Sequence, residues 1–450
     1  MIFYTLRSTI QGMRRMTNTA HYYHTIAFIV VSILFVPSLG FGQSATTATN
    51  VQSKAVDSAA IALINTSLKL IPGKKEISDL GAVPDGYKNI ILDEGINYLQ
   101  QGNEIIARLQ REKDTKGVSS RRGATDSVAL SYLNALARMI AARKIFAAMD
   151  HKAGVASITG NIGNIYAQQG DLTTALEYFL KAAKMDEEAG NLGNVATMYG
   201  NTGLAYQNQN NYGKAVEYYV KAVKLANESG DKFLAANMAG NAGIVYALQK
   251  DYPKAMQYYF QSMKMHAEAG DKNGEEIIAA NIGGIYETLG DYPTALKYYT
   301  KALALAGEIN NAKSVADVSM SIGEVYGKQG DYTKALDHMN RSLATCEAIG
   351  YKIGAAVAAR NIGDILTKQG NYLLAISYLD KAKSLNVEVD DKNERPYLLF
   401  GLGTAYLHLA SDTSVASGQL PNAISEQSAQ NLANGVTTTP PTPINTPNNT

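Results

Sequence analysis

The sequence predicts an all-α protein, a right-handed α-solenoid in which helix–turn–helix units stack into a superhelix. Three observations predict this class. Glycines recur every 40 residues along more than half of the chain. Apolar side chains recur at helical spacing before and after each unit's central turn. That turn carries a Gly-Asp pair or a close variant, which separates the two predicted helices of a unit.

The repeat is defined by three sets of positions. Its glycines are Gly163, Gly203, Gly243, Gly283, Gly323, Gly363 and Gly403. Its aromatic residues are Tyr166, Tyr206, Tyr246, Tyr286, Tyr326 and Tyr406. Its small residues are Ala175, Ala215, Ala255, Ala295, Ala335 and Ala375. Glycine inside a helix costs about 1 kcal/mol relative to alanine. We therefore expect each glycine to admit a large side chain of the partner helix, such as Phe179 or Tyr219, against the backbone.

Residues 153–190 illustrate one unit. Its first apolar stripe includes Ile158, Ile162 and Ile165, at the spacing of one helix face. Gly170 then suits the left-handed position that ends a helix, and Asp171 suits the N-cap of the next one. Recurring acidic residues at this position are therefore predicted to be caps rather than catalytic groups.

These residues identify a resemblance. The pattern Asn-x-Gly-x-x-Tyr followed by Gly-Asp-Tyr-x-x-Ala-Leu-x-Tyr-Tyr-x-Lys-Ala resembles the tetratricopeptide repeat (TPR), whose basic unit has about 34 residues. The period of 40 is similar to the arrays of kinesin light chains, of Leu-Gly-Asn-repeat scaffolds and of sensory modules in bacteria of the Bacteroidetes type. The sequence departs from the pattern in having no Trp near the start of the first helix. The resemblance implies a concave surface, lined by the first helices, that binds proteins or peptides.

The chain is expected to divide into six segments. Residues 1–42 are a signal peptide, and 43–87 are a linker that is unstructured at 43–60, with one possible helix at Val56–Ile71. Residues 88–150 are a degenerate first repeat with helices at Asn89–Arg111 and Ser131–Met149. The array covers 151–410, as six full units and the first helix of a seventh, followed by a degenerate C-terminal cap at 411–436 and a disordered Thr/Pro/Asn-rich tail at 437–450.

The N-terminal segment has the order of an export signal. Arg7, Arg14 and Arg15 precede an apolar stretch over 25–36, and small residues then stand at the −3 and −1 positions of a cut before Gln43. The stretch is shorter than the roughly 20 residues of a membrane span. Export to the periplasm or cell envelope follows, with an uncleaved N-terminal anchor as the alternative. Since three Arg and no acid precede the cut, the charge changes from +1 to +1 − 3 = −2.

Composition excludes several functional classes. The 41 basic and 40 acidic residues nearly balance, which argues against a strongly basic nucleic-acid binder. The single cysteine, Cys346, excludes an internal disulfide and is predicted to be an inert, packed thiol. His338 replaces a repeat tyrosine and is predicted to serve packing. Because no nucleotide, protease or hydrolase motif occurs, we predict no enzyme activity, no catalytic residue, no metal site and no cofactor.

The candidate ligand groove rests on an asparagine ladder, which comprises Asn161, Asn201, Asn241, Asn281 and Asn361, with Ser321 in the remaining unit. Side-chain amides can donate to and accept from the backbone of an extended peptide. The alternative is a structural hydrogen bond that ties neighbouring helices. One helical turn away stand the further groove candidates Asn164, Gln168, Asn208, Asn237, Arg360 and Lys368. The groove should be rich in amides at first and of mixed charge towards the C-terminus.

The functional expectation is an exported scaffold without catalysis that binds a protein or peptide in this groove, with no nucleic-acid partner and no membrane span in the mature chain. The alternative is a sensory or regulatory repeat module of a signalling protein such as a histidine kinase, a nucleotide cyclase or a transcription regulator, lacking its output domain.

Overall fold

The computed structural model describes residues 45–68, 85–116, 122–389, 391 and 394–411. Within them the chain forms 16 α-helices and no strand. The predicted signal peptide, C-terminal cap and tail lie outside the described residues, apart from the cap's first residue, Ser411. The helices are α3 (Ala45–Leu68), α4 (Asp85–Lys116), α5 (Arg122–Ala148), α6 (Lys152–Gln168), α7 (Leu172–Glu188), α8 (Leu192–Asn208), α9 (Tyr212–Glu228), α10 (Lys232–Leu248), α11 (Tyr252–Glu268), α12 (Lys272–Thr288), α13 (Tyr292–Glu308), α14 (Ala312–Gln329), α15 (Tyr332–Ala348), α16 (Lys352–Lys368), α17 (Tyr372–Val389) and α18 (Arg395–Ser411).

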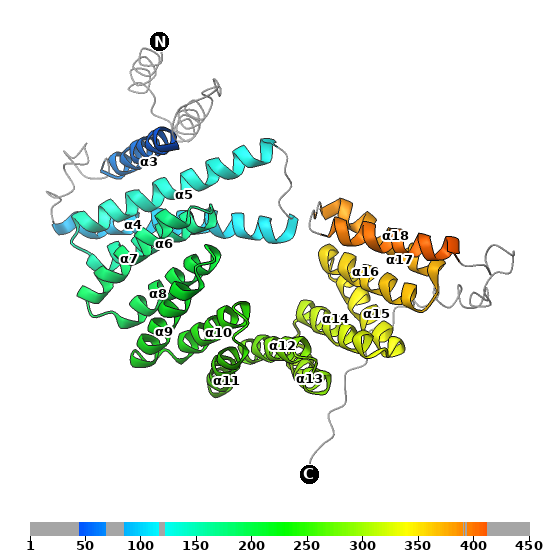
Figure 1. Ribbon diagram of the computed structural model, residues 1–450. Helices are drawn as coiled ribbons and strands as arrows, with labels where there is room; N and C mark the ends of the chain where they lie inside the picture. Colours follow the sequence, from blue (N-terminus) through cyan, green and yellow to red (C-terminus); the bar gives the residue numbers. More distant parts are fainter. Residues whose placement is uncertain (1–44, 69–84, 117–121, 390, 392–393, 412–450) are drawn as a thin grey trace. The chain divides into compact units, whose positions relative to one another are not determined.

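The predicted all-α class is confirmed, since consecutive helices pack as helix–turn–helix units (Figure 1). The chain divides into two compact units, residues 1–285 and 286–450, with the division inside α12. In the first unit the pairs are α6 with α7, α8 with α9 and α10 with α11. In the second they are α14 with α15 and α16 with α17, and α18 packs against α16 and α17.

The turn between helices uses a left-handed residue, as predicted. Gly170 has φ +84°, and the equivalent glycines of other turns take similar values. Where the repeat lacks this glycine, Asn210, Lys250 and Asn310 adopt positive φ themselves. The next residue then caps the following helix, because the carboxylate of Asp171 accepts a hydrogen bond from the backbone N–H of Thr174 at 3.1 Å.

The repeat glycines are sites of close helix approach. A Cβ atom added at Gly163, Gly203 or Gly243 would lie 2.6 to 2.8 Å from the ring of Phe179, Tyr219 or Tyr259 of the partner helix. At the equivalent positions, Met339 lies against Gly323 and Leu379 lies against Gly363. We call these five large residues the anchors. Each follows the unit's repeat alanine by four positions and is buried.

The N-terminal helices correct two expectations. Residues 43–60 were expected to be unstructured, but in the described part α3 starts at Ala45 and buries Val56, Ala60, Ile64 and Leu68 against α5. Because these four residues are spaced by four, they lie on one face of the helix, and this face packs against α5. The polar residues before Val56 continue the same helix. Helix α4 covers Asp85–Lys116, longer at both ends than the expected 89–111.

Candidate functional site

The ladder lies on the first helix of each pair. In the first unit these helices adjoin one another, α6 with α8 and α8 with α10. In the second unit α14 adjoins α16, and α16 adjoins α18. Figure 1 shows α8 and α10 together on one side of the stack and α9 and α11 on the other. Ladder side chains are half-buried, except for the buried Asn361.

Two ladder members make the structural hydrogen bond. The Nδ2 of Asn201 donates to the Oδ1 of Asn164 at 3.2 Å. The Nδ2 of Asn361 donates to the Oε1 of Glu324 at 2.8 Å. Both bonds join a ladder amide to the residue that lies 37 positions earlier, on the preceding first helix. For Asn201 and Asn361, the structure therefore supports the structural role, a hydrogen bond between neighbouring helices, over ligand binding.

Two other ladder members lack this partner. The positions 37 residues before Asn241 and Asn281 are occupied by Leu204 and Ile244, which have no polar side-chain group. Within the described chain the amides of Asn241 and Asn281 make no hydrogen bond, while both remain partly accessible. Their donors and acceptors are therefore available to a ligand.

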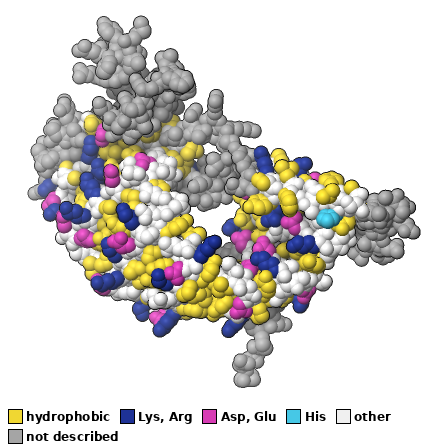
Figure 2. Space-filling view, in the orientation of Figure 1, with side chains coloured by type: hydrophobic (Ala, Val, Ile, Leu, Met, Phe, Trp, Pro, Cys, Tyr) yellow, Lys and Arg dark blue, Asp and Glu magenta, His cyan; other side chains and the backbone are white. Residues whose placement is uncertain are grey.

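Exposed apolar side chains occur on the two helices that carry these amides, α10 and α12, and on the preceding first helix, α8. Leu204, Leu248 and Ile277 are each about half exposed, at 47%, 52% and 46%. Ile244 and Leu248 follow Asn241 by three and seven residues on α10, and Ile277 precedes Asn281 by four residues on α12, so each shares a helix face with its asparagine. Leu204 lies on the neighbouring helix α8, 37 positions before Asn241, and we call these six residues the amide–apolar strip. Figure 2 shows hydrophobic side chains at the surface between charged ones. The apolar members were not among the groove residues predicted from the sequence. Their positions, three or seven residues after a ladder member or four before one, follow from the 40-residue period and could have indicated them.

The remaining groove candidates of the first unit have separate positions. Gln168 and Asn208 are exposed near the ends of α6 and α8. Asn237 and Asn161 are half-buried on α10 and α6, one turn before Asn241 and one turn before Ile165 respectively. Within the described residues, no hydrogen bond joins these four side chains to one another.

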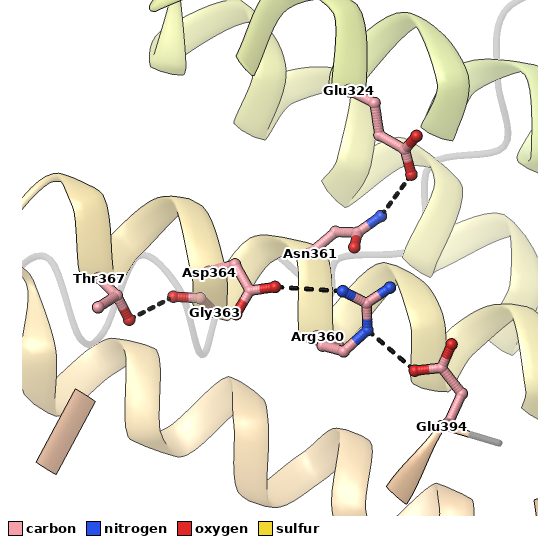
Figure 3. Close-up of polar contacts among 7 residues, drawn as sticks. All are labelled: Glu324, Arg360, Asn361, Gly363, Asp364, Thr367 and Glu394. Atoms are coloured by element: carbon pink, nitrogen blue, oxygen red, sulfur yellow. Dashed lines mark hydrogen bonds and ion pairs between the residues drawn. The ribbon is translucent and has the colours of Figure 1, made fainter. Parts of the chain in front are cut away.

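The second unit carries a charged cluster on the equivalent helices (Figure 3). Arg360 donates from Nε to Glu394 at 2.9 Å and from an Nη to Asp364 at 3.2 Å. Lys328 donates to Glu287 at 2.9 Å, and the hydroxyl of Tyr299 donates to the same carboxylate at 2.7 Å. The predicted mixed charge is present, and sequence reasoning had not included Glu287 or Glu394.

This cluster borders a pocket of about 280 Å³. Arg360, Lys368 and Asn361 all contribute to its wall, as do Glu324 and Asp364. Burial raises the pKa of Glu324, and the nearby Glu287 raises it further. Burial also raises the pKa of Asp364, although Arg360 opposes this shift. The pocket thus combines basic side chains with carboxylates that are held partly out of water.

Replacing Glu324 with Gln tests whether burial raises the pKa of this carboxyl group. Because the folded pKa lies above the ordinary value of 4.5, the folded chain binds the proton more tightly than the unfolded chain. The resulting stabilisation is complete below the ordinary pKa and is lost as pH rises through the folded pKa. Glu324→Gln should therefore gain melting temperature relative to wild type, by a few degrees, as the pH rises above the ordinary pKa of 4.5.

The measurement is thermal unfolding followed by circular dichroism at several pH values. Glu388→Gln is the matched control, because Glu388 forms an exposed ion pair with Lys352 at 2.6 Å and 53% exposure. A difference between Glu324→Gln and wild type that stays constant with pH would contradict the assignment.

Cys346 and His338, two side chains with the reactivity that catalysis needs, have packing roles in the structure. Cys346 is fully buried, and burial raises the pKa of its thiol to about 11, as expected for an inert cysteine. His338 stacks on Tyr326 with ring centroids 5.8 Å apart, and burial lowers its pKa. The described residues include no group of three or more His, Cys, Asp or Glu arranged to hold a metal ion. None of the described helices is long and apolar enough to cross a membrane.

Family models decide the identity of the repeat. A tetratricopeptide-repeat model matches residues 194–268 and 274–348, and a second matches residues 156–188 and 361–386. The chain is a tetratricopeptide-repeat protein. Its TPR units are the helix pairs described above, and their anchors fill the glycine faces of the first helices. No curated protein sequence matches the chain.

Solved structures with a similar fold are only distantly similar in sequence. BtubC (BKLC) from P. vanneervenii has 18% identity and a TM-score of 0.44, with 47% of this chain and 89% of that chain covered. A Rap protein complexed with competence and sporulation factor has 13% identity and a TM-score of 0.41, with 73% and 99% covered. The TPR2AB domain of yeast Sti1 in complex with pHSP90 has 19% identity and a TM-score of 0.25, with 56% and 98% covered. These values are too low to transfer a function to this TPR protein.

Proposed function

We propose that this TPR protein is an exported scaffold without a catalytic role, and that its first unit binds a peptide segment of a partner protein along the amide–apolar strip. The observation that carries this proposal is the pair of unbonded amides, Asn241 and Asn281, set among half-exposed Leu204, Leu248 and Ile277. Export rests on the order of the N-terminal residues, and the N-terminal peptide of the mature protein, identified by mass spectrometry, tests cleavage before Gln43.

The chemistry of the strip suits a peptide. A peptide backbone presents N–H and C=O groups along its length, and each asparagine amide offers both a donor and an acceptor to them. Exposed apolar side chains beside the amides bury area against the ligand's side chains. Because repeats place equivalent groups at regular intervals, one extended or helical segment can contact α8, α10 and α12 in turn.

Display of random peptides on phage against the full chain selects a peptide ligand directly. For a recovered peptide, the double substitution Asn241→Ala and Asn281→Ala should raise Kd at least about tenfold. This estimate follows because each lost hydrogen bond contributes about 1 kcal/mol and 1.4 kcal/mol corresponds to a factor of ten. Isothermal titration calorimetry measures the change.

Two controls separate binding from folding. Asn227→Ala changes an exposed amide on α9, the second helix of its pair, and should leave Kd unchanged. Asn201→Ala removes the bond to Asn164, so it should lower stability by about 1 kcal/mol while having little effect on the peptide. If the double variant folds and keeps the wild-type Kd, the strip is not the binding surface.

A further inference from the structure

The pocket of the second unit is a candidate site that peptide binding by the amide–apolar strip does not use. Its volume is about 280 Å³, and residues of α14, α15 and α16 form its wall. The strip belongs to the first unit, so the two sites consist of different residues. Because this volume is near the lower limit of ligand pockets in proteins, the pocket suits a small molecule.

Gly327 provides part of the pocket's space. The repeat has Gln207 at the equivalent position of α8 and Glu287 at that of α12. A Cβ added at Gly327 would already lie 3.4 Å from Cδ1 of Ile365, so a longer side chain would occupy the pocket. Together with Met339 and Ile365, this glycine forms an apolar part of the wall.

The charged residues of the pocket have the same order on both first helices. Glu324 precedes Lys328 by four residues on α14, and Asp364 precedes Lys368 by four residues on α16. Four residues advance about 6 Å along a helix and return to nearly the same face, so each carboxylate lies one turn before a lysine. The pocket therefore has carboxylates towards one end and lysines towards the other.

Hydrogen bonds hold both carboxylates and leave part of each available (Figure 3). Glu324 accepts from Asn361 through Oε1 at 2.8 Å, and Asp364 accepts from Arg360 through Oδ2 at 3.2 Å. Within the described residues, the second oxygen of each carboxylate accepts no hydrogen bond. Burial raises the pKa of both groups, so a positive charge brought close to them would stabilise their ionised forms.

One basic side chain of the pocket has no partner. Lys328 donates to Glu287 at 2.9 Å, and Arg360 is bonded to Asp364 and Glu394. Among the residues that the structure describes, Lys368 forms neither a hydrogen bond nor an ion pair. Lys368 is therefore the basic group that is most available to an anion.

We propose that this pocket binds a free α-amino acid with an aliphatic side chain, such as leucine. The ammonium group of the ligand donates to Glu324 and Asp364, and its carboxylate accepts from Lys368. Its side chain packs against Met339 and Ile365. Hydrogen bonds of about 3 Å at either side of the ligand allow its two adjacent charged groups to reach residues one helical turn apart.

The charges of the pocket favour a zwitterion over other small molecules. A ligand with one charge would leave either the carboxylates or Lys368 without a partner. A charged side chain would lie against Met339 and Ile365, where it loses water without gaining a partner. Asn361 contributes by holding Glu324 rather than by contact with the ligand.

Isothermal titration calorimetry of the full chain with L-leucine tests the site. We expect one molecule to bind per chain, with a Kd below about 1 mM. L-Leucinamide lacks the carboxylate and resembles a peptide N-terminus, and 4-methylpentanoate lacks the ammonium group. Each should bind at least about tenfold more weakly than leucine, because a charge-assisted hydrogen bond is lost.

Two substitutions remove different parts of the pocket. Gly327→Gln fills its space with the residue that the repeat already has at Gln207, and should raise the Kd for leucine at least about tenfold. Lys368→Gln removes the partner of the ligand's carboxylate and should have an effect of similar size. Because Lys368 is exposed, its melting temperature should stay as in wild type. Lys352→Gln, at an exposed lysine of α16 outside the pocket, is the matched control and should keep the wild-type Kd.

Three results would overturn the proposal. The first is a chain that binds none of leucine, isoleucine, valine and methionine at concentrations up to about 10 mM. The second is leucine binding that is unchanged in both Gly327→Gln and Lys368→Gln, because the ligand would then lie elsewhere. The third is equal binding of leucine and leucinamide, which would show recognition of an amine such as a peptide N-terminus. None of these results depends on peptide binding by the strip, which is tested with substitutions in the first unit.

Discussion

Tyr219→Ala should destabilise the first unit by about 3–5 kcal/mol. Tyr219 has no exposed surface, and its ring lies against Gly203, where an added Cβ would be 2.8 Å from Cδ1. It also packs with Ala215, Ala242 and Val245. Removing the ring leaves a cavity between α8, α9 and α10 that rigid backbones cannot close.

Tyr219→Phe isolates the hydroxyl from the ring. The Oη of Tyr219 donates to the Oε1 of Gln207 at 3.0 Å, so this variant should lose only about 1 kcal/mol. Urea denaturation followed by circular dichroism measures both. Since repeat arrays unfold in parts, the transition of the affected repeats should separate from that of the others in Tyr219→Ala. Equal effects of the two variants would show that the ring contributes no packing energy, contrary to its burial.

Gly243→Ala should also destabilise, by about 1–3 kcal/mol, although alanine is the better helix former by about 1 kcal/mol. The new methyl group would lie 2.6 Å from Cδ1 of Tyr259, which is closer than two carbon atoms approach in proteins. Tyr259 is almost fully buried and cannot move aside without displacing its neighbours.

Gly213→Ala is the matched control for this substitution. Gly213 lies in helix α9, where an added Cβ would meet no atom within 4 Å. Alanine should therefore stabilise there by up to about 1 kcal/mol, through helix propensity alone. The same urea titrations measure the sign of both changes. A stabilised Gly243→Ala variant would contradict the interpretation that the repeat glycines exist for close packing.

The helix pairs of the repeat array could be predicted from the sequence because the same short-range residue pattern recurs in every unit. The Gly at the left-handed turn and the Asp at the N-cap act on residues a few positions away, and each anchor stands four residues after a repeat alanine. Gly170, Asp171 and Phe179 could therefore be interpreted without a structure. The start of α3 could not, because Ala45 begins a helix whose later turns are stabilised by packing against α5.

The candidate site divides in the same way. The positions of the asparagine ladder follow from the period, but whether a member is bonded depends on the residue 37 positions earlier. That residue is Asn164 before Asn201 and Leu204 before Asn241, so one amide is bonded and the other is available. Both roles are open in the sequence, because the sequence does not show which positions of neighbouring helices meet.

By itself, the sequence determined the class, the period and the helix pairs of this TPR protein, since these depend on contacts between residues close in the chain. Only the tertiary structure decided which side chain, if any, packs against each glycine of the first helices. Gly200 faces Met238 of the next repeat, Gly203 faces Tyr219 of its own pair, and Gly403 faces no atom of the described residues within 4 Å of an added Cβ. The physical reason is that a glycine's role is set by what approaches it, and the approaching side chain comes from another helix.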